Sequence, residues 1–315
     1  MFIKKILEQL NIPAQCKRYG LSLWQCPQFL FILMGVIIIA STLTTYAIGT
    51  KYIEEPELVA LIVLLITAIL FIVAAVITRS FERLAEANRM KSEFISIVSH
   101  QLRSPLSNLK WAIELLMSGR LGKIEEKQTE YFRILKENSG RMGELVSDLL
   151  IVSRIETARL PLRKDEFSLE NLIRELIKEF ESFARASNVE IEFKSEANLP
   201  KILADPSRIR LVIENLLDNA IRYVKDSGKV KMLLEKRAQN LYFEIKDNGV
   251  GIPKEDQKYI FQKFFRSENV LKYQTQGSGL GLYISKAIIE RSAGKIGFKS
   301  QEGVGSTFWF TLPIK

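Results

Sequence analysis

The chain has 315 residues, of which 47% are hydrophobic and 26% are charged, and its formal net charge is +9 at pH 7. This length allows about two domains, and the hydrophobic share is high for a soluble protein of this size. Basic residues are interspersed with acidic ones and partly flank apolar segments. The positive charge therefore does not indicate a nucleic-acid-binding protein, and we expect no nucleic-acid partner.

Two uncharged apolar segments of 20 residues each lie near the start of the chain, at residues 29–48 and 58–77. A helix of that length rises about 30 Å, which matches the hydrocarbon thickness of a bilayer. Core helices of soluble proteins are seldom apolar on every side, and the first segment lacks the cleavage site of a signal peptide. We therefore predict transmembrane helices at residues 28–49 and 58–78.

The charges beside these segments predict their orientation. Lysine and arginine precede the first segment and follow the second, whereas the short connector 50–57 carries mostly glutamate. By the positive-inside rule, the N-terminal segment 1–27 and the C-terminus are both cytoplasmic.

Cys16 and Cys26 match no common metal-binding spacing. Since the connector is too short to enclose a ligand pocket, we expect sensing within the bilayer or through another membrane protein.

The helical pattern continues beyond the second segment and contains the only histidine of the chain, His100. Apolar positions from Val98 to Leu116 recur at spacings of mostly four and three, which is typical of a helical bundle. His100 lies about 200° of helical rotation from Val98 and from Leu102, so it projects away from this apolar stripe. Pro105 removes one backbone hydrogen bond, and we expect the helix to bend just past the histidine.

A second helix with an apolar stripe follows the glycine-containing turn near residue 120. Its stripe has a strict 4-3 spacing and consists of Tyr131, Leu135, Asn138, Met142, Leu145, Leu149 and Val152. A hairpin of two such helices cannot bury its stripe alone, whereas two copies can form a four-helix bundle. We expect a homodimer, with a signalling helix and dimerisation domain at residues 79–160.

Residues 161–315 are predicted to form an α/β sandwich with helices layered on one sheet. Residues 157–166 lack periodicity and contain Pro161, which is typical of a linker. Residues 167–186 and 205–224 are predicted as helices. The predicted strands, which alternate and are rich in aromatic and β-branched residues, are 189–195, 229–237, 240–247, 294–300 and 306–313.

Four motifs in this domain suit nucleotide binding, although each alone has an ordinary reading as a solvated helix face or a turn. In ENLLDNAIRY, Asn215 and Asn219 lie one helical turn apart, and neutral amides can hold Mg²⁺ that is already bound to phosphate. In DNGVGIP, the Asp247 carboxylate can accept a hydrogen bond from an adenine amino group. GSGLGL precedes a helix whose N-terminus can receive phosphate, and GVGSTF turns into a final strand.

The order of the motifs is more specific than any one of them. SHQLRSPL, NLLDNA, DNGVGIP, IFQKFFR, GSGLGL and GVGSTF resemble the H, N, G1, F, G2 and G3 boxes of bacterial two-component sensor histidine kinases, over residues from about 90 to 315. The resemblance implies a HisKA-type dimerisation and phosphoacceptor domain followed by a catalytic ATP-binding domain of the Bergerat (GHKL) type. It also implies an ATP-dependent protein-histidine kinase in the bacterial cytoplasmic membrane, with ATP and Mg²⁺ as cofactors and a cytoplasmic response regulator as partner.

The resemblance further implies roles for single residues of the catalytic domain. Asn219 would be the main Mg²⁺ ligand, with Asn215 beside it, and Asp247 would bind the adenine amino group. The segment 261–281 would be a lid over the triphosphate. The implied ATP-binding residues are Asn215, Asn219, Arg222, Tyr223, Asp247, Gly249, Gly251, Lys263, Phe264, Gly277, Gly279, Leu280, Gly281 and Thr307.

His100 would be the phosphoacceptor, and two residues near it depart from the family pattern. Gln101 stands where the family usually has an acid that orients the imidazole and accepts its Nδ1 proton; a carboxamide can hold this N–H but cannot take the proton. Ser104 stands where Thr or Asn usually helps to place a water for dephosphorylation of the partner. We expect a slow but active kinase, with a phosphatase activity that the Ser104 hydroxyl still allows. In the ATP-binding domain, Arg222 replaces the usual lysine.

Three functions are compatible with these motifs. The favoured one is a membrane histidine kinase that phosphorylates His100 from ATP and passes the phosphoryl group to an aspartate of a response regulator. Gln101 gives some weight to a catalytically weak or silent ATP-binding scaffold, or to a phosphatase-biased kinase. An ATPase of the gyrase-like superfamily would share the nucleotide pocket but lacks the helical hairpin, and it is disfavoured.

Overall fold

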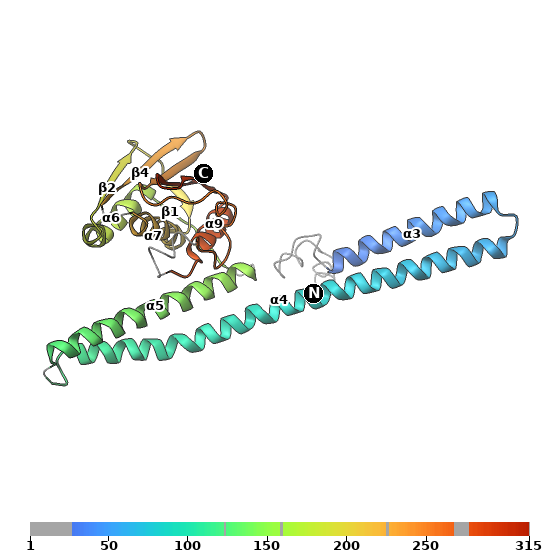
Figure 1. Ribbon diagram of the computed structural model, residues 1–315. Helices are drawn as coiled ribbons and strands as arrows, with labels where there is room; N and C mark the ends of the chain where they lie inside the picture. The colour runs from blue at the N-terminus through green and yellow to red at the C-terminus, as the bar shows by residue number, and fades with distance from the viewer. Residues whose placement is uncertain (1–26, 123, 158–159, 225–226, 268–276, 315) are drawn as a thin grey trace. The chain divides into compact units, whose positions relative to one another are not determined.

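The computed structural model describes residues 27–314 except 123, 158–159, 225–226 and 268–276 (Figure 1). The N-terminal segment with Cys16 and Cys26 and most of the LKYQTQGS stretch lie outside the described residues. The chain divides into two compact units. One consists of residues up to 105 together with 153–160, and the other consists of 106–152 together with 161–315.

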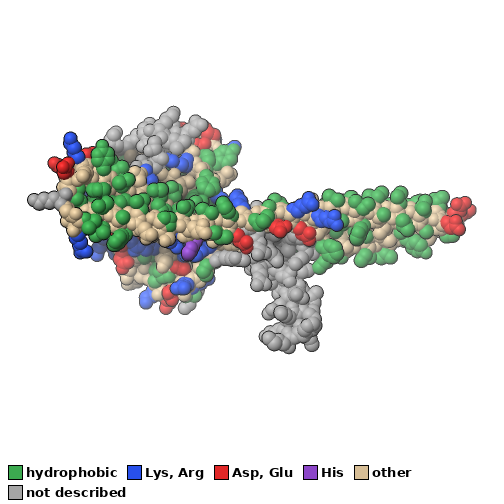
Figure 2. Space-filling model, turned by 90° about the horizontal axis from the view of Figure 1, so that it is seen from below, with side chains coloured by type: hydrophobic (Ala, Val, Ile, Leu, Met, Phe, Trp, Pro, Cys, Tyr) green, Lys and Arg blue, Asp and Glu red, His purple; other side chains and the backbone are tan. Residues whose placement is uncertain are grey.

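The first unit is built on helix α3 (Pro27–Tyr52) and the first part of helix α4 (Pro56–Met117). Both contain stretches that are long and apolar enough to cross a membrane, at Phe29–Tyr52 and Pro56–Ala87. Apolar side chains cover this pair of helices, and acidic side chains gather at the turn between them (Figure 2). The helices are joined by a hydrogen bond of 3.2 Å between the Thr42 and Thr67 hydroxyls. The helix-forming and apolar character predicted for both segments is therefore present.

Helix α4 runs for 62 residues and contains Pro105, as the uninterrupted helical pattern predicts. His100, Gln101 and Ser104 are all exposed on it. In the second unit, the last part of α4 is followed by helix α5 (Glu126–Glu156), and Lys136 forms an ion pair with Glu114 at 3.6 Å.

The apolar stripe of the hairpin is poorly covered in the single chain. Leu109 is 43% exposed, Leu135 is 48% exposed and Met142 is 44% exposed. Exposed leucines at regular helical spacing are unusual on a monomer and are typical of helices that pack against a partner. The stripe predicted from the sequence thus has an open face.

A five-stranded sheet forms the centre of the C-terminal domain. Its order is β2 (Val189–Ser195), β4 (Gly228–Arg237), β5 (Asn240–Lys246), β7 (Gly305–Pro313) and β6 (Lys295–Gln301). Strands β2 and β4 are parallel, and the other neighbours are antiparallel. Helices α6 (Leu169–Ala186), α7 (Pro206–Arg222) and α9 (Gly281–Arg291) cover one face of the sheet (Figure 1). The α/β sandwich is as predicted.

Helix α7 positions most of the site residues, and both its start and its packing follow from the sequence. Asp205 caps its N-terminus by accepting a hydrogen bond from the Arg208 N–H at 3.1 Å, and Pro206 occupies the first helical position. The face of α7 toward the sheet is fully apolar and consists of Ile209, Val212, Ile213, Leu216, Leu217, Ala220 and Ile221, all buried. The asparagines of ENLLDNAIRY therefore lie beside this buried face rather than within it.

The prediction of a linker without secondary structure at residues 157–166 is wrong for its last two residues. Strand β1 (Asp165–Phe167) overlaps the predicted linker 157–166 and pairs antiparallel with β3 (Ile202–Ala204) to form a second, two-stranded sheet. Three residues are too few for an alternating pattern to be visible, and the pairing joins segments more than 30 residues apart. The Asp205 cap extends this junction, because its carboxylate also accepts the Arg163 N–H at 2.8 Å.

Candidate functional site

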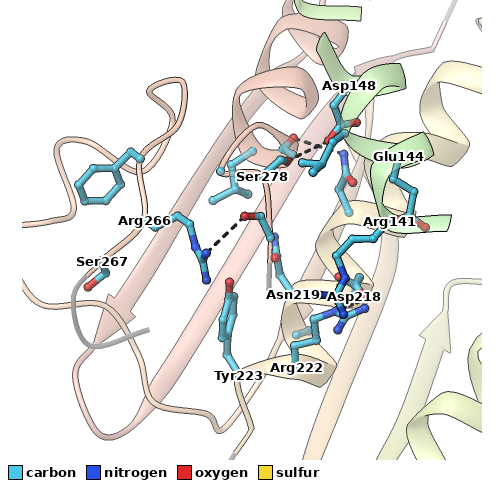
Figure 3. A pocket seen from close by; sticks show the side chains of 18 of the residues that line it. Arg141, Glu144, Asp148, Asp218, Asn219, Arg222, Tyr223, Arg266, Ser267 and Ser278 are labelled. Atoms are coloured by element: carbon cyan, nitrogen blue, oxygen red, sulfur yellow. Dashed lines mark hydrogen bonds and ion pairs between the residues drawn. The ribbon is translucent and has the colours of Figure 1, made fainter. Parts of the chain in front are cut away.

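A pocket of about 950 Å³ opens beside α7 and the start of α9, large enough for a nucleotide (Figure 3). The residues that line it include nine of the fourteen named above as ATP-binding. These nine are Asn215, Asn219, Arg222, Tyr223, Asp247, Gly251, Gly277, Gly279 and Gly281. They come from α7, the turn after β5 and the loop before α9, so the fold brings together motifs that are up to 66 residues apart.

Asp247 provides a buried carboxylate at the end of β5, with only 6% of the residue exposed. Its Oδ1 atom accepts hydrogen bonds from the N–H groups of Gly249 at 2.9 Å and Ser306 at 3.1 Å. Burial raises the pKa of this carboxyl, and the two backbone N–H groups oppose the rise. Because the backbone N–H groups bond to Oδ1, Oδ2 is available for a donor on a ligand in the pocket.

The two asparagines of α7 play different parts. The Asn215 amide donates to the Gly281 carbonyl at 3.3 Å and to the Ser285 hydroxyl at 3.5 Å, so it joins α7 to α9. The Asn219 side chain lines the pocket and forms no hydrogen bond with another described residue. Asn219 is therefore the amide that is available to a ligand or a metal ion, whereas the amide N–H of Asn215 serves the packing of the domain.

Arg222 and Tyr223 close the end of α7. The Arg222 Nε donates to both carboxylate oxygens of Asp218 at 2.7 Å, and its guanidinium lies 5.1 Å from the centre of the Phe183 ring. An anion in the pocket would meet a guanidinium whose charge is already partly neutralised. Tyr223 is largely buried, which raises the pKa of its phenol, and its carbonyl accepts the Val250 N–H at 3.0 Å. The end of α7 is thereby fastened to the DNGVGIP turn.

Gly251 occupies a position where a side chain does not fit. Its φ is +66°, and a Cβ atom there would lie 2.0 Å from the Gln301 carbonyl oxygen. The positive φ favours glycine by about 1–2 kcal/mol, and the contact with backbone adds to this cost.

We expect Gly251→Ala to lower the free energy of unfolding of the C-terminal domain by about 3 kcal/mol or more. Gly303→Ala is the matched control, because Gly303 has φ +76° and nothing within 4 Å of its added Cβ. That control should cost only about 1 kcal/mol. Denaturation followed by circular dichroism measures both, and equal losses would contradict the role given to the Gln301 contact.

The loop before α9 is held at both of its described ends. The Arg266 Nη1 donates to the Gly277 carbonyl at 3.3 Å, across the stretch 268–276 that is not described. Gly279 has φ +68°, and a Cβ there would lie 2.9 Å from the backbone of Phe264. The Ser278 hydroxyl accepts the Leu280 N–H at 3.2 Å. These contacts set the entry of the chain into α9.

Five residues named from the resemblance lie outside the pocket lining. Gly249 packs against the Tyr223 carbonyl, and Leu280 is buried under the start of α9. The Lys263 ammonium lies 5.1 Å from the centre of the Tyr283 ring, and Phe264 is 62% exposed while its neighbour Phe265 lines the pocket. Thr307 points to the face of the sheet opposite the helices, because its neighbours Ser306 and Phe308 line the pocket and side chains alternate along a strand.

Several residues that line the pocket were not identified from the sequence. Helix α5 contributes Arg141, Glu144 and Asp148 (Figure 3). The Asp148 carboxylate accepts a hydrogen bond of 2.9 Å from the Ser278 hydroxyl, and burial raises the pKa of Asp148. Ser278 sits inside GSGLGL, so the motif contained a signal for it, whereas nothing in the α5 sequence distinguishes Asp148 from other acids on a helix.

The site fits a magnesium–nucleotide complex better than a free metal ion. No group of three potential metal-binding His, Cys, Asp or Glu side chains occurs in the described part of the chain. The amide oxygen of Asn219 is a single neutral ligand, and Mg²⁺ bound to phosphates and waters requires few ligands from the protein. The buried Asp247 carboxylate and the pocket volume suit an adenine base with an amino group.

Two family models match the chain. The model for the His Kinase A (phospho-acceptor) domain matches residues 90–158, which include His100. The model for the histidine kinase-, DNA gyrase B- and HSP90-like ATPase matches residues 204–315, which contain most of the pocket. The chain belongs to the histidine kinase family. Within this family match, His100 is the sole histidine, and it lies exposed on α4 in the first of the two compact units.

Known histidine kinases are similar to this chain over about three quarters of its length. The circadian input-output histidine kinase CikA of Synechococcus elongatus is 31% identical over 229 residues, which cover 72% of this chain and 30% of CikA. The signal transduction histidine-protein kinase BarA of Escherichia coli is 30% identical over 239 residues, which cover 74% of this chain and 26% of BarA. This chain thus matches about a third or less of the length of these relatives.

Solved histidine kinase structures share the fold. Full-length ShkA in complex with AMPPNP superposes with a TM-score of 0.60 and 28% identity, covering 70% of this chain and 45% of ShkA. ThkA in complex with the response regulator protein TrrA has a TM-score of 0.50 and 26% identity, covering 72% of this chain and 64% of ThkA.

Proposed function

We propose that this histidine kinase transfers the γ-phosphoryl group of ATP to His100 and then to an aspartate of a response regulator. The observation that carries the proposal is the pairing of two features in one chain. The only histidine is exposed within the region that the phospho-acceptor model matches. The region that the ATPase model matches contains most of a pocket with the buried Asp247 carboxylate and the Asn219 amide, which has no hydrogen bond to a described residue. The ShkA complex with AMPPNP supports ATP as the nucleotide, and the ThkA complex supports a response regulator as partner.

Different pocket residues bind the adenine, the metal ion and the phosphates of ATP. The Asp247 Oδ2 accepts a hydrogen bond from the adenine amino group, while the Gly249 and Ser306 N–H groups hold Oδ1 in place. Asn219 offers its amide oxygen to Mg²⁺, which neutralises charge on the phosphates when bound. The N–H groups around Gly279 and Gly281 and the positive end of α9 receive phosphate oxygens.

The transfer step forms a bond between the His100 Nε2 and Pγ and breaks the bond between Pγ and the leaving oxygen of ADP. The transition state is loose, so the protein chiefly positions the two reactants and stabilises charge. An imidazole attacks through a lone pair, which requires its proton to be on Nδ1. The exposed carboxamide of Gln101 can accept this Nδ1–H and so orient the ring, but it cannot remove the proton.

We expect Gln101→Glu to raise the rate of autophosphorylation by roughly tenfold, because a carboxylate both orients the imidazole and accepts its proton. The initial rate of label incorporation from ATP measures the effect. Asn108→Asp adds the same charge at an exposed position of the same helix and should leave the rate unchanged. An equal rise in both variants would contradict the role given to position 101.

The hairpin is proposed to act as a homodimer. The exposed stripe of α4 and α5, which includes Leu109 and Leu135, supports a four-helix bundle made from two chains. We further propose that residues 79–160 form the signalling and dimerisation part and that 161–315 form the catalytic part. Ser104 keeps a hydroxyl one turn beyond His100, which supports a phosphatase activity toward the partner.

The two apolar helices are proposed to span the bacterial cytoplasmic membrane with both termini inside. Their length and hydropathy support this placement, as do Glu54, Glu55 and Glu57 at the turn and the arginines that follow the second helix. With a turn of so few residues, the stimulus is proposed to act within the bilayer or through another membrane protein.

A catalytically weak or silent ATP-binding scaffold is the second candidate, and Gln101 is the observation that favours it. One experiment separates the candidates. The full chain in detergent micelles is incubated with γ-labelled ATP and Mg²⁺, and the protein-bound label is tested for stability in acid and in base. Acid-labile, base-stable label supports the kinase. ATP binding without label supports the scaffold, and ATP hydrolysis without label supports an ATPase.

A further inference from the structure

The face of the sheet opposite the helices carries a row of lysines. Strand pairing places Lys231 opposite Lys246, Lys246 opposite Thr307, and Thr307 opposite Lys299. These four residues, called the lysine row below, cross β4, β5, β7 and β6 in one line. The three lysines are exposed, and adjacent strands lie about 4.8 Å apart, so the row extends about 14 Å.

Two of the three lysines in the lysine row carry a charge that no ion pair in the described part of the domain neutralises. Lys231 lies 3.8 Å from Glu192 of β2, whereas Lys246 and Lys299 have no ion pair with any residue that the structure describes. Like charges placed directly opposite each other across paired strands lower stability. Retaining such a row on an exposed face favours a role in binding something negatively charged.

An aromatic ridge lies beside the lysine row on the same face. Trp309 lies flat against Gly297, where an added Cβ would come within 2.4 Å of the indole. The Trp309 and Tyr242 rings are stacked with their centres 6.1 Å apart, and the Arg237 guanidinium lies 3.4 Å from the centre of the Tyr242 ring. The Tyr242 hydroxyl donates to Glu244 at 2.6 Å. Trp, Tyr and Arg are the residues that contribute most often to binding energy at protein interfaces.

We propose that this face is a docking surface for an acidic segment of a partner protein, separate from both His100 and the nucleotide pocket. The partner's carboxylates pair with Lys231, Lys246 and Lys299, and its apolar side chains contact Trp309. A span of about 14 Å matches about nine residues of a helix, which can present acidic side chains on one face.

A protein segment fits this face better than an anionic membrane. Trp309 lies flat and half-buried, so it does not project far enough to enter a lipid headgroup layer. Glu192, Glu235 and Glu244 lie on the same face. A uniform layer of lipid phosphates would meet these carboxylates too, whereas a partner protein can place its acids opposite the lysines alone.

The test uses the full chain in neutral detergent micelles and a fluorescein-labelled ten-residue alanine peptide with glutamate at positions 1, 4, 5 and 8, which a helix places on one face. The triple variant Lys231→Gln, Lys246→Gln, Lys299→Gln is expected to weaken peptide binding at least tenfold, as measured by fluorescence anisotropy at constant salt. The control removes the same charge from exposed lysines elsewhere in the domain, with Lys178→Gln, Lys201→Gln, Lys254→Gln, and should change binding less than twofold. Both variants should keep the circular dichroism spectrum and the thermal unfolding midpoint of the wild-type chain, which shows that the domain is folded.

Three outcomes would overturn the proposal. The first is equal weakening by both triple variants, which would mean that net charge alone attracts the peptide. The second is no binding of the peptide by the wild-type chain. The third is displacement of the peptide by phosphatidylglycerol vesicles at lower anion concentration than by unlabelled peptide, which would assign the face to a membrane surface. None of these results depends on whether His100 is the phosphoacceptor.

Discussion

A chain with His100→Gln is expected to incorporate no acid-labile phosphate from γ-labelled ATP while it still binds ATP with wild-type affinity. Glutamine keeps the size and polarity of the side chain but has no ring nitrogen lone pair to attack Pγ. His100 is exposed on α4, so its replacement should not disturb packing. The measurement is label retained on the full chain after treatment with base, together with binding of a fluorescent ATP analogue.

Because the chain has no other histidine, no second imidazole can carry the label in this experiment. Residual acid-labile, base-stable label in the His100→Gln variant would have to lie on a different kind of side chain, and that result would contradict the proposed phosphoacceptor. Asn108→Gln is the matched control, because residue 108 is also exposed on α4 and lies eight residues further along. The control should incorporate label at the wild-type rate.

Asp247→Asn is expected to weaken ATP binding by about ten- to a hundredfold, because it replaces a charge-assisted hydrogen bond worth about 1.5–3 kcal/mol. The same change should not destabilise the catalytic domain. The asparagine oxygen can still accept from the Gly249 and Ser306 N–H groups, and the burial of a charge is removed. Binding of an ATP analogue and thermal unfolding at pH 7 measure the two effects.

The pH dependence of stability gives a second signature of this carboxyl. Burial raises the pKa of Asp247 in the folded domain above the ordinary aspartate value, so between these two values the folded state binds more protons than the unfolded state. The contribution of Asp247 to stability therefore falls as the pH rises through this window. Asp247→Asn should remove that contribution, whereas Asp165→Asn, at an exposed position of β1, should not. A large loss of stability in Asp247→Asn at pH 7 would contradict the interpretation.

Much of the fold was predictable because its signals are local. The apolar segments that become α3 and the start of α4 are uniform over 20 residues. Helix α7 combines an Asp-Pro start with an apolar face, and β4, β5 and β7 alternate over seven or more residues. The small β1–β3 sheet was missed because neither strand exceeds three residues and their pairing is set by distant parts of the chain.

The motifs predicted which segments line the pocket, but they did not predict the hydrogen-bond partners or the side-chain direction of each residue. Asn215 and Asn219 are indistinguishable in ENLLDNAIRY, yet only the position of α9 decides that Asn215 bonds to Gly281 and Ser285. Ser306 and Thr307 are neighbours in GVGSTF, and strand alternation alone turns Ser306 toward Asp247 and Thr307 toward the opposite face. Such assignments depend on tertiary contacts that a single sequence does not contain.

The alternation along β7 has a consequence for how this domain can change over evolution. The Ser306 N–H donates to the Asp247 carboxylate on one face, and Thr307 and Trp309 form part of the lysine row and the aromatic ridge on the other. Inserting or deleting a single residue at the start of β7 would exchange the two faces at every following position. Strand β7 can therefore tolerate substitutions but hardly any change in length. A change of length that suited the pocket face would displace Thr307 and Trp309 from the opposite face, and the reverse also holds.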